Sequence, residues 1–287
     1  MVPKNRQVEW EGDGFPANLQ MLEQPELPST TTSYNAADNN LIIYTEIPRV
    51  SVIIPALNEA KNLPFVLPKI PTGIFEVILV DGHSSDDTIR VARVLLPNIR
   101  IVVQEGHGKG DALRAGFKAA HGEIIVMLDA DGSTDPTDIP AFVSCLLSGV
   151  DYAKGSRFLP GGGTADMGLL RKLGNWAFVY LVRQIYGGKF TDLCFGYNAF
   201  WKDTLRHLYL TTDGFEIETE MNIQALRANL WIAEVACFEA ARIHGVSNLN
   251  TFRDGWRVLH TIIRQYRKFD RRSLPAWLSS QTSSEIR

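Results

Sequence analysis

Four short apolar segments at regular spacing constrain the fold of this chain more than any other feature. They occupy residues 50–55, 76–80, 99–103 and 123–128. Their valine, isoleucine and leucine content, without strict polar alternation, is typical of strands buried on both faces of a parallel sheet. Helices are predicted between them, at residues 58–69, from an N-cap within 84–88 to residue 95, and at 110–120. This alternation predicts an α/β fold: a doubly wound, mostly parallel sheet flanked by helices.

Polar residues stand near the carboxyl ends of three of the predicted strands. Asn58 and Glu59 follow the first strand, Asp81 follows the second, and Asp129 and Asp131 follow the fourth. Ligands of open α/β sheets bind beyond the carboxyl ends of the strands. We therefore expect three separate loops to converge on one crevice.

Composition and charge are ordinary for a globular protein. Hydrophobic residues make up 45% and charged residues 21% of the chain, which supports a sizeable core, and the net charge of −3 gives no reason to expect a nucleic-acid partner. We predict four parts: an N-terminal extension or linker at 1–45, a main α/β domain at 46–240, a C-terminal amphipathic helical segment at 241–270 and a flexible Ser-rich tail at 271–287.

The cysteines and the termini bear on cellular location. Cys145, Cys194 and Cys237 are far apart, form no C-x-x-C pair and sit in apolar stretches, so we predict reduced core thiols. The polar N-terminus has no apolar h-region, and no apolar run approaches the roughly 18 residues that span a bilayer. These features predict a cytoplasmic protein.

Asp129-Ala130-Asp131 is the motif with the most direct chemical meaning. It follows an apolar strand and precedes Gly132. Two carboxylates one residue apart can share a hard divalent cation with a diphosphate. The cation would neutralise the charge that grows on a leaving nucleotide. An ordinary acidic turn is the alternative, because Asp and Gly also favour turns.

Other motifs accompany this pair in a fixed order. They are Pro55-Ala56-Leu57-Asn58-Glu59, Val80-Asp81-Gly82 with Asp86-Asp87-Thr88, Gly108-Lys109-Gly110, Gly155-Ser156-Arg157-Phe158, Pro160-Gly161-Gly162-Gly163, the segment from Asp192 to Phe200, and Gly245-Val246-Ser247-Asn248-Leu249. In this order the sequence resembles the glycosyltransferase family 2 enzymes with the GT-A fold. Within that family it is most similar to polyprenyl-phosphate mannose or glucose synthases of the dolichol-phosphate mannose synthase type. The resemblance covers about residues 50–268.

The resemblance implies a nucleotide-sugar site. It implies that Pro55, Leu57 and Glu59 line the nucleotide pocket and that Asp81 contacts the base. The alternative for Glu59 is an exposed carboxylate in a first helical turn, where the helix dipole favours it. The alternative for Asp81 is a strand-end turn residue. Lys109 follows a flexible glycine and can supply a counter-charge to the nucleotide, or it can simply stand in the turn before a helix.

The resemblance also implies a metal site for Mg²⁺ or Mn²⁺. Asp129 would face the nucleotide and Asp131 the metal, or both would share it. His244 would complete the metal shell, although a lone histidine is more often structural. Arg242 would hold phosphate.

Arg157 would act in catalysis by meeting a phosphate of the donor or the acceptor; a solvated surface arginine is the alternative. The resembled synthases usually carry Lys or Arg where this chain has Asn248, a departure that bears on the handling of the acceptor phosphate.

The predicted reaction is inverting transfer of a hexose from a nucleotide diphosphate sugar, of the GDP-mannose or UDP-glucose type, to a polyprenyl phosphate. A phosphate is already anionic, so this reaction needs no general base. Two alternatives stay open. A soluble glycosyltransferase acting on a hydroxyl of a small molecule would need a base such as Glu216 or Glu218. A nucleotide-sugar-binding protein without catalysis would need none.

Two stretches suggest contact with a membrane surface. Residues 167–186 and 255–269 mix apolar side chains with Arg and Lys and include Trp176, Tyr180 and Trp256. Basic amphipathic helices with such aromatics can lie flat on anionic bilayers. The alternative is that both helices pack their apolar faces on the domain. Taken with a lipid-phosphate acceptor, they suggest peripheral contact with the inner face of the cell membrane.

Overall fold

The computed structural model describes residues 48–246 and 250–267, together with the backbone of four short strands that precede them. These are β1 (Trp10–Glu11), β2 (Phe15–Pro16), β3 (Thr31–Asn35) and β4 (Asn40–Tyr44). Strands β3 and β4 pair as an antiparallel hairpin within the segment predicted as extension or linker. The predicted tail at 271–287 and Asn248 lie outside the described residues.

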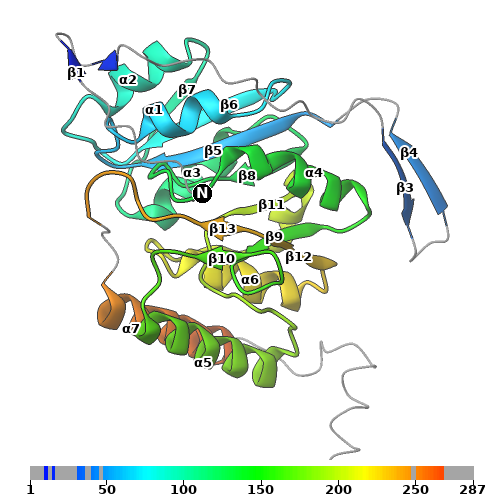
Figure 1. The fold of residues 1–287 in the computed structure, drawn as a ribbon. Helices are drawn as coiled ribbons and strands as arrows, with labels where there is room; N and C mark the ends of the chain where they lie inside the picture. Colours follow the sequence, from blue (N-terminus) through cyan, green and yellow to red (C-terminus); the bar gives the residue numbers. More distant parts are fainter. Residues whose placement is uncertain are drawn as a thin grey trace, which may run out of the picture.

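A seven-stranded sheet forms the centre of the molecule (Figure 1). Its strands, in spatial order, are β12 (Ile232–Ala236), β9 (Tyr152–Ser156), β11 (Asn198–Trp201), β8 (Ile124–Met127), β5 (Val50–Ala56), β6 (Glu76–Asp81) and β7 (Arg100–Val103). Only β11 runs antiparallel to its neighbours within this sheet. The predicted α/β fold with a mostly parallel sheet is therefore confirmed. A separate parallel pair joins β10 (Gly163–Thr164) to β13 (Phe238–Glu239).

Both faces of the sheet are buried, as the apolar runs predict. Val52 and Ile54 of β5 point into one core cluster, while Ile53 points into the other. The first cluster is covered by α1 (Leu63–Val66), α2 (Thr88–Leu95) and α4 (Ile139–Leu147), and the second by α3 (Lys109–Ala119) and α6 (Ile217–Arg227). Short 3-10 helices complete the connections: η1 (Leu67–Lys69), η2 (Pro136–Asp138) and η3 (Lys202–His207).

The helix predicted from residue 58 starts later than expected. Helix α1 begins at Leu63, and the residues before it form turns. Asn58 adopts a left-handed backbone conformation with φ of 58°, which a helix does not accommodate. Pro64 stands in the first turn, where its missing N–H costs nothing. The prediction was wrong for residues 58–62, and the turn leaves Glu59 at the end of the sheet.

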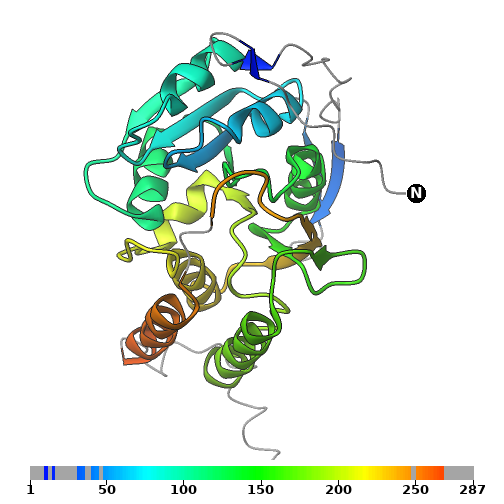
Figure 2. The same cartoon turned by 60° about the vertical axis from the view of Figure 1, so that its left-hand side comes forward.

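Two long helices form a third layer beneath α6. Helices α5 (Leu169–Tyr186) and α7 (Thr251–Arg267) lie side by side at the end of the molecule farthest from α1 (Figures 1 and 2). They pack on α6 through a third apolar cluster that includes Val182, Ile223 and Ile262. Both are amphipathic, with one buried and one exposed face. No helix in the described part of the chain is long and apolar enough to cross a bilayer.

The three cysteines are free thiols. Burial raises the pKa of Cys194 and of Cys237 to about 12, so neither forms a thiolate readily near neutral pH. These two side chains behave as the predicted core thiols.

Gly116 offers a test of the packing between α3 and the sheet. A methyl group at this position would overlap Ile53 and come within 3.0 Å of Val80 Cγ2. We expect Gly116→Ala to lower the free energy of unfolding by about 1–3 kcal/mol, because overpacking displaces the two strands. Urea denaturation monitored by circular dichroism measures this.

Gly174→Ala is the matched control, since a methyl group at this glycine of α5 meets no neighbouring atom within 4 Å. It should raise stability by about 0.5–1 kcal/mol, because alanine favours the helix interior over glycine. If Gly116→Ala and Gly174→Ala changed the free energy of unfolding equally, the close approach of α3 to β5 would be contradicted.

Candidate active site

A cavity of about 290 Å³ opens at the carboxyl ends of the central parallel strands. Strand β5 pairs in parallel with both β6 and β8, so the loops that follow these strands lie together. Seven of the predicted site residues line this cavity: Pro55, Leu57, Glu59, Lys109, Asp129, Asp131 and Arg242. Three others, Asp81, Arg157 and His244, do not line it. The crevice predicted from the strand ends is therefore present.

Asp129 belongs to a chain of three charges. Lys109, the first residue of α3, places its Nζ 2.6 Å from Asp129 Oδ1 and 2.8 Å from Glu218 Oε1. Burial lowers the pKa of Lys109, but the charges of Asp129 and Glu218 outweigh burial and raise that pKa above its ordinary value. Lys109 is therefore a fixed cation on the cavity wall.

Sequence reasoning considered Glu218 only as a base or a first-turn acid. It missed the pairing with Lys109, which depends on how α6 packs against α3.

Asp131 belongs to a second chain of three charges. Its Oδ2 lies 3.5 Å from Arg242 Nε, and Arg242 also forms an ion pair with Glu59. The Glu59 carboxylate is buried and accepts a hydrogen bond of 2.5 Å from Asn62 Nδ2. Burial raises the pKa of Glu59, while Asn62 and Arg242 oppose that rise. Arg242 is thus a second cation on the cavity wall, and Glu59 is no exposed first-turn acid.

The donor atoms of Asp129 and Asp131 fit a hard divalent cation. Their side chains are 28% and 23% exposed, so both carboxylates are accessible from the cavity. The described residues contain no group of three His, Cys, Asp or Glu side chains arranged around one point. Mg²⁺ is commonly held by one or two carboxylates, with substrate phosphates and water completing the shell. Two protein ligands match that mode of binding.

Two unsatisfied acceptors lie at the cavity, one in its lining and one beside it. Asp81, at the end of β6, accepts a hydrogen bond from the Ser84 backbone N–H at 3.0 Å through Oδ2. Its Oδ1 is buried without a hydrogen-bond partner, and so is Oε1 of Gln104, which lines the cavity. Gly82 joins Asp81 to the cavity lining. Sequence reasoning missed Gln104, since no motif marks it. These acceptors suit a ligand with N–H donors, such as a nucleobase.

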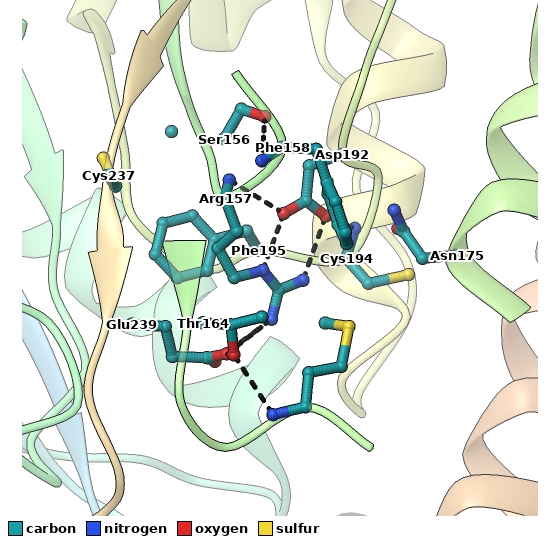
Figure 3. Close-up of polar contacts among 12 residues, drawn as sticks. Ser156, Arg157, Phe158, Thr164, Asn175, Asp192, Cys194, Phe195, Cys237 and Glu239 are labelled. Atoms are coloured by element: carbon teal, nitrogen blue, oxygen red, sulfur yellow. Dashed lines mark hydrogen bonds and ion pairs between the residues drawn. The ribbon is translucent and has the colours of Figure 1, made fainter. Parts of the chain in front are cut away.

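Arg157 lies in a separate buried cluster (Figure 3). Its Nε and Nη2 donate to the two carboxylate oxygens of Asp192 at 2.7 and 2.9 Å, and its Nη1 donates to Glu239 Oε1 at 3.0 Å. The guanidinium also lies over the Phe195 ring, 4.8 Å from the centroid. Arg157 is only 7% exposed, so the surface-arginine interpretation is wrong. Its predicted contact with phosphate would require one of these carboxylates to give way, and it stays a prediction.

His244 lies beside the cavity and packs against Phe65, with 5.7 Å between ring centroids. Its backbone N–H donates to Asn62 Oδ1 at 2.9 Å. The ring Nε2 is buried without a hydrogen-bond partner. Its role as a third metal ligand stays a prediction, because the structure does not gather it with Asp129 and Asp131.

Comparison with known proteins defines the class. The family described as Glycosyl transferase family 2 matches residues 51–209. The chain is also 31% identical to glycosyltransferase AglJ of Haloferax volcanii, over 75% of this chain and 71% of that protein. It is 31% identical to the undecaprenyl-phosphate mannosyltransferase of Micrococcus luteus, over 70% of this chain and 88% of that protein. The chain therefore belongs to glycosyl transferase family 2, and it is a transferase by family.

Two further similarities are informative. The chain is 31% identical to the dolichol-phosphate mannosyltransferase of Pyrococcus furiosus, over 70% of this chain but only 59% of that protein. The fold matches glucosyl-3-phosphoglycerate synthase of Mycobacterium tuberculosis, solved with Mn²⁺ and uridine diphosphate. That match has a TM-score of 0.61 at 23% identity and covers 78% of this chain and 82% of the other. At this identity the likeness shows the fold alone, which is the predicted GT-A fold.

The Arg157 cluster yields a test of stability. Substitution Asp192→Asn removes one charge from an ion pair whose side chains are only 5% and 0% exposed. We expect the free energy of unfolding to fall by about 3–5 kcal/mol, because the buried guanidinium loses its main counter-charge. Differential scanning calorimetry measures the loss.

Asp203→Asn is the control, because the Arg206–Asp203 pair is 78% exposed on both sides. It should change stability by less than about 0.5 kcal/mol. A wild-type unfolding temperature for Asp192→Asn would contradict a structural role for the cluster.

Proposed function

We propose that the protein is an inverting hexosyltransferase. In this proposal it transfers a hexose from a nucleotide diphosphate sugar, of the GDP-mannose or UDP-glucose type, to a polyprenyl phosphate. The observation that carries the proposal is the single cavity in which the carboxylates of Asp129 and Asp131 meet the cations of Lys109 and Arg242. Two relatives with 31% identity, named as undecaprenyl-phosphate and dolichol-phosphate mannosyltransferases, support the choice of acceptor.

The donor fits the cavity by charge and polarity. Lys109 and Arg242 would attract the diphosphate, and Asp129 and Asp131 would hold Mg²⁺ or Mn²⁺, which would supply further positive charge for the phosphates. Pro55 and Leu57 supply an apolar wall beside the nucleotide. In this arrangement Gln104 Oε1, in the cavity lining, and Asp81 Oδ1, beside it, would accept hydrogen bonds from the base.

The chemistry requires charge stabilisation more than proton transfer. An acceptor phosphate oxygen forms a bond to the anomeric carbon while the bond from that carbon to the nucleoside diphosphate breaks. The attacking oxygen carries no proton that must be removed, so no general base is needed. When bound, the divalent cation neutralises charge on the departing diphosphate. Lys109 and Arg242 act in the same direction, as preorganised cations in a partly enclosed site.

Asp131 is the residue that tests this proposal. We expect Asp131→Ala to abolish sugar transfer, by about 100-fold or more, because a group that stabilises transition-state charge is lost. The assay uses radiolabelled GDP-mannose and UDP-glucose with undecaprenyl phosphate and either Mg²⁺ or Mn²⁺. Asp135→Ala, four residues along and outside the cavity lining, should transfer at close to the wild-type rate.

Normal metal-dependent transfer by Asp131→Ala would refute the assigned site. Transfer by the wild type to hydroxyl acceptors, and none to undecaprenyl phosphate, would instead identify a glycosyltransferase that acts on small molecules. Donor binding without transfer to any acceptor would identify a binding protein.

The third layer of helices supports peripheral contact with a membrane. On α5, Leu169, Leu173, Trp176 and Tyr180 follow a helical spacing, and each is more than half exposed. The same helix carries Arg171, Lys172 and Arg183 and no acidic residue. On α7, Phe252 and Trp256 are 79% and 70% exposed. Apolar residues with basic neighbours on one exposed layer complement an anionic bilayer.

Liposome flotation tests the membrane contact. At low salt the full chain should co-float with vesicles of phosphatidylglycerol and phosphatidylcholine, and less with phosphatidylcholine alone, because the basic side chains lose their counter-charge. The double substitution Leu173→Glu with Trp176→Glu should reduce the floated fraction about tenfold, since charge in the apolar stripe opposes insertion.

Val94→Glu is the control for a surface charge, because Val94 is an exposed apolar residue of α2, outside the third layer. It should float like the wild type. Absence of wild-type flotation with anionic vesicles would remove the membrane from the proposal and leave the transfer reaction intact.

A further inference from the structure

Each carboxylate of the Asp129-Ala130-Asp131 motif contacts a cation that a second, more deeply buried carboxylate also holds. On one side, exposure of the side chains falls from 28% at Asp129 through 12% at Lys109 to 4% at Glu218. On the other side, it falls from 23% at Asp131 through 18% at Arg242 to 7% at Glu59. The two aspartates are therefore more accessible than the two glutamates.

The contact at Lys109 is tightly enclosed. A methyl group on Gly196 would lie 2.6 Å from Lys109 Nζ, 2.9 Å from Asp129 Oδ2 and 3.2 Å from Glu218 Oε1. The backbone at Gly196 thus lies directly against the three charged groups, and a larger residue there would displace the ends of these side chains. Because Lys109 is nearly buried, a state in which it lost all its counter-charges would be costly.

We propose that Glu218 is a positioning residue that holds Lys109 on the cavity wall when Asp129 turns to a divalent cation. In the absence of ligand, Lys109 is shared between the two carboxylates. When Asp129 becomes a metal ligand, Lys109 keeps Glu218 as its counter-charge and directs its freed N–H donor towards the diphosphate. The inference rests on the proposed function, because it takes Asp129 as a metal ligand.

Glu218 acts in this account through Lys109 and not on the acceptor. Its carboxylate does not line the donor cavity, and Lys109 occupies its Oε1. Glu59 and Arg242 repeat the arrangement beside Asp131, with Asn62 holding the buried carboxylate in place. The buried Nε of Arg242 lies 3.5 Å from Asp131 Oδ2 but donates no hydrogen bond, so it could donate one if Asp131 turned to a metal ion.

Manganese binding tests the proposal without reference to turnover. Free Mn²⁺ is titrated by electron paramagnetic resonance against the full chain, alone and with GDP or UDP. We expect Glu218→Gln to weaken Mn²⁺ binding about tenfold, the effect of losing one charge-assisted contact, because Lys109 then has no anionic partner other than Asp129. Glu216→Gln removes the same charge from the start of the same helix without touching Lys109, and should change the affinity by less than about twofold.

A double-mutant cycle separates positioning from a general field effect. In a Lys109→Met background, Glu218→Gln should change Mn²⁺ affinity by less than about twofold, because the residue through which it acts is gone. Equal weakening by Glu218→Gln with and without Lys109 would overturn the proposal. Equal weakening by Glu218→Gln and Glu216→Gln would also overturn it, and this comparison remains available if Lys109→Met does not fold.

The outcomes also distinguish this inference from the proposed function. A wild-type chain that binds no Mn²⁺, with or without nucleoside diphosphate, overturns both the metal site and the role of Glu218. Wild-type binding that Glu218→Gln leaves unchanged overturns the positioning role alone. Thermal unfolding of each variant establishes that the measured chain is folded.

Discussion

Strand β5 pairs in parallel with β6 on one side and with β8 on the other, and the position of the charged groups follows from that pairing. Parallel neighbours end at the same edge of a sheet, so the turn at Glu59, the strand end at Asp81 and the loop at Asp129 meet there. The buried valines and isoleucines of β5 fix its place between two cores. The packing of these apolar side chains thereby holds the polar side chains at the strand ends close together.

The charges at this edge have a negative sum. Four carboxylates surround Lys109 and Arg242. With all four ionised, two negative charges are left uncompensated, which one divalent cation would neutralise. Like charges in a partly enclosed cavity repel strongly, so the two cations are needed even without ligand. In the proposed function the same cations would attract a diphosphate. An acidic site would then bind an anionic donor because a metal ion and basic residues together offset the negative charge.

The strands and the meeting of their loops were predictable from the sequence, because buried parallel strands leave continuous apolar runs such as residues 50–55. The partners of the charged residues were not. Lys109 meets Glu218 across a gap of more than one hundred residues, and Arg157 meets Asp192 through a loop without regular structure. Local pattern encodes burial and periodicity, whereas such pairs depend on how helices and loops pack. The late start of α1 was missed for a related reason, since the left-handed backbone of Asn58 leaves no periodic signal.

A short loop connects the ion-pair cluster of Arg157 with the charged groups around Lys109. Arg157 can therefore affect the structure of the cavity without lining it. Arg157 donates to both carboxylate oxygens of Asp192. Burial raises the pKa of the Asp192 carboxyl, but the contact with Arg157 outweighs burial and lowers that pKa below its usual value. Four residues after Asp192, the backbone of Gly196 lies against Lys109, Asp129 and Glu218. The Arg157–Asp192 ion pair, outside the cavity, therefore holds in place the backbone that encloses these charges. A buried ion pair is stable only when its hydrogen-bond geometry is good. The Arg157–Asp192 pair therefore favours one arrangement of the loop over others. The precision of the charged cavity thus depends on contacts that no ligand touches.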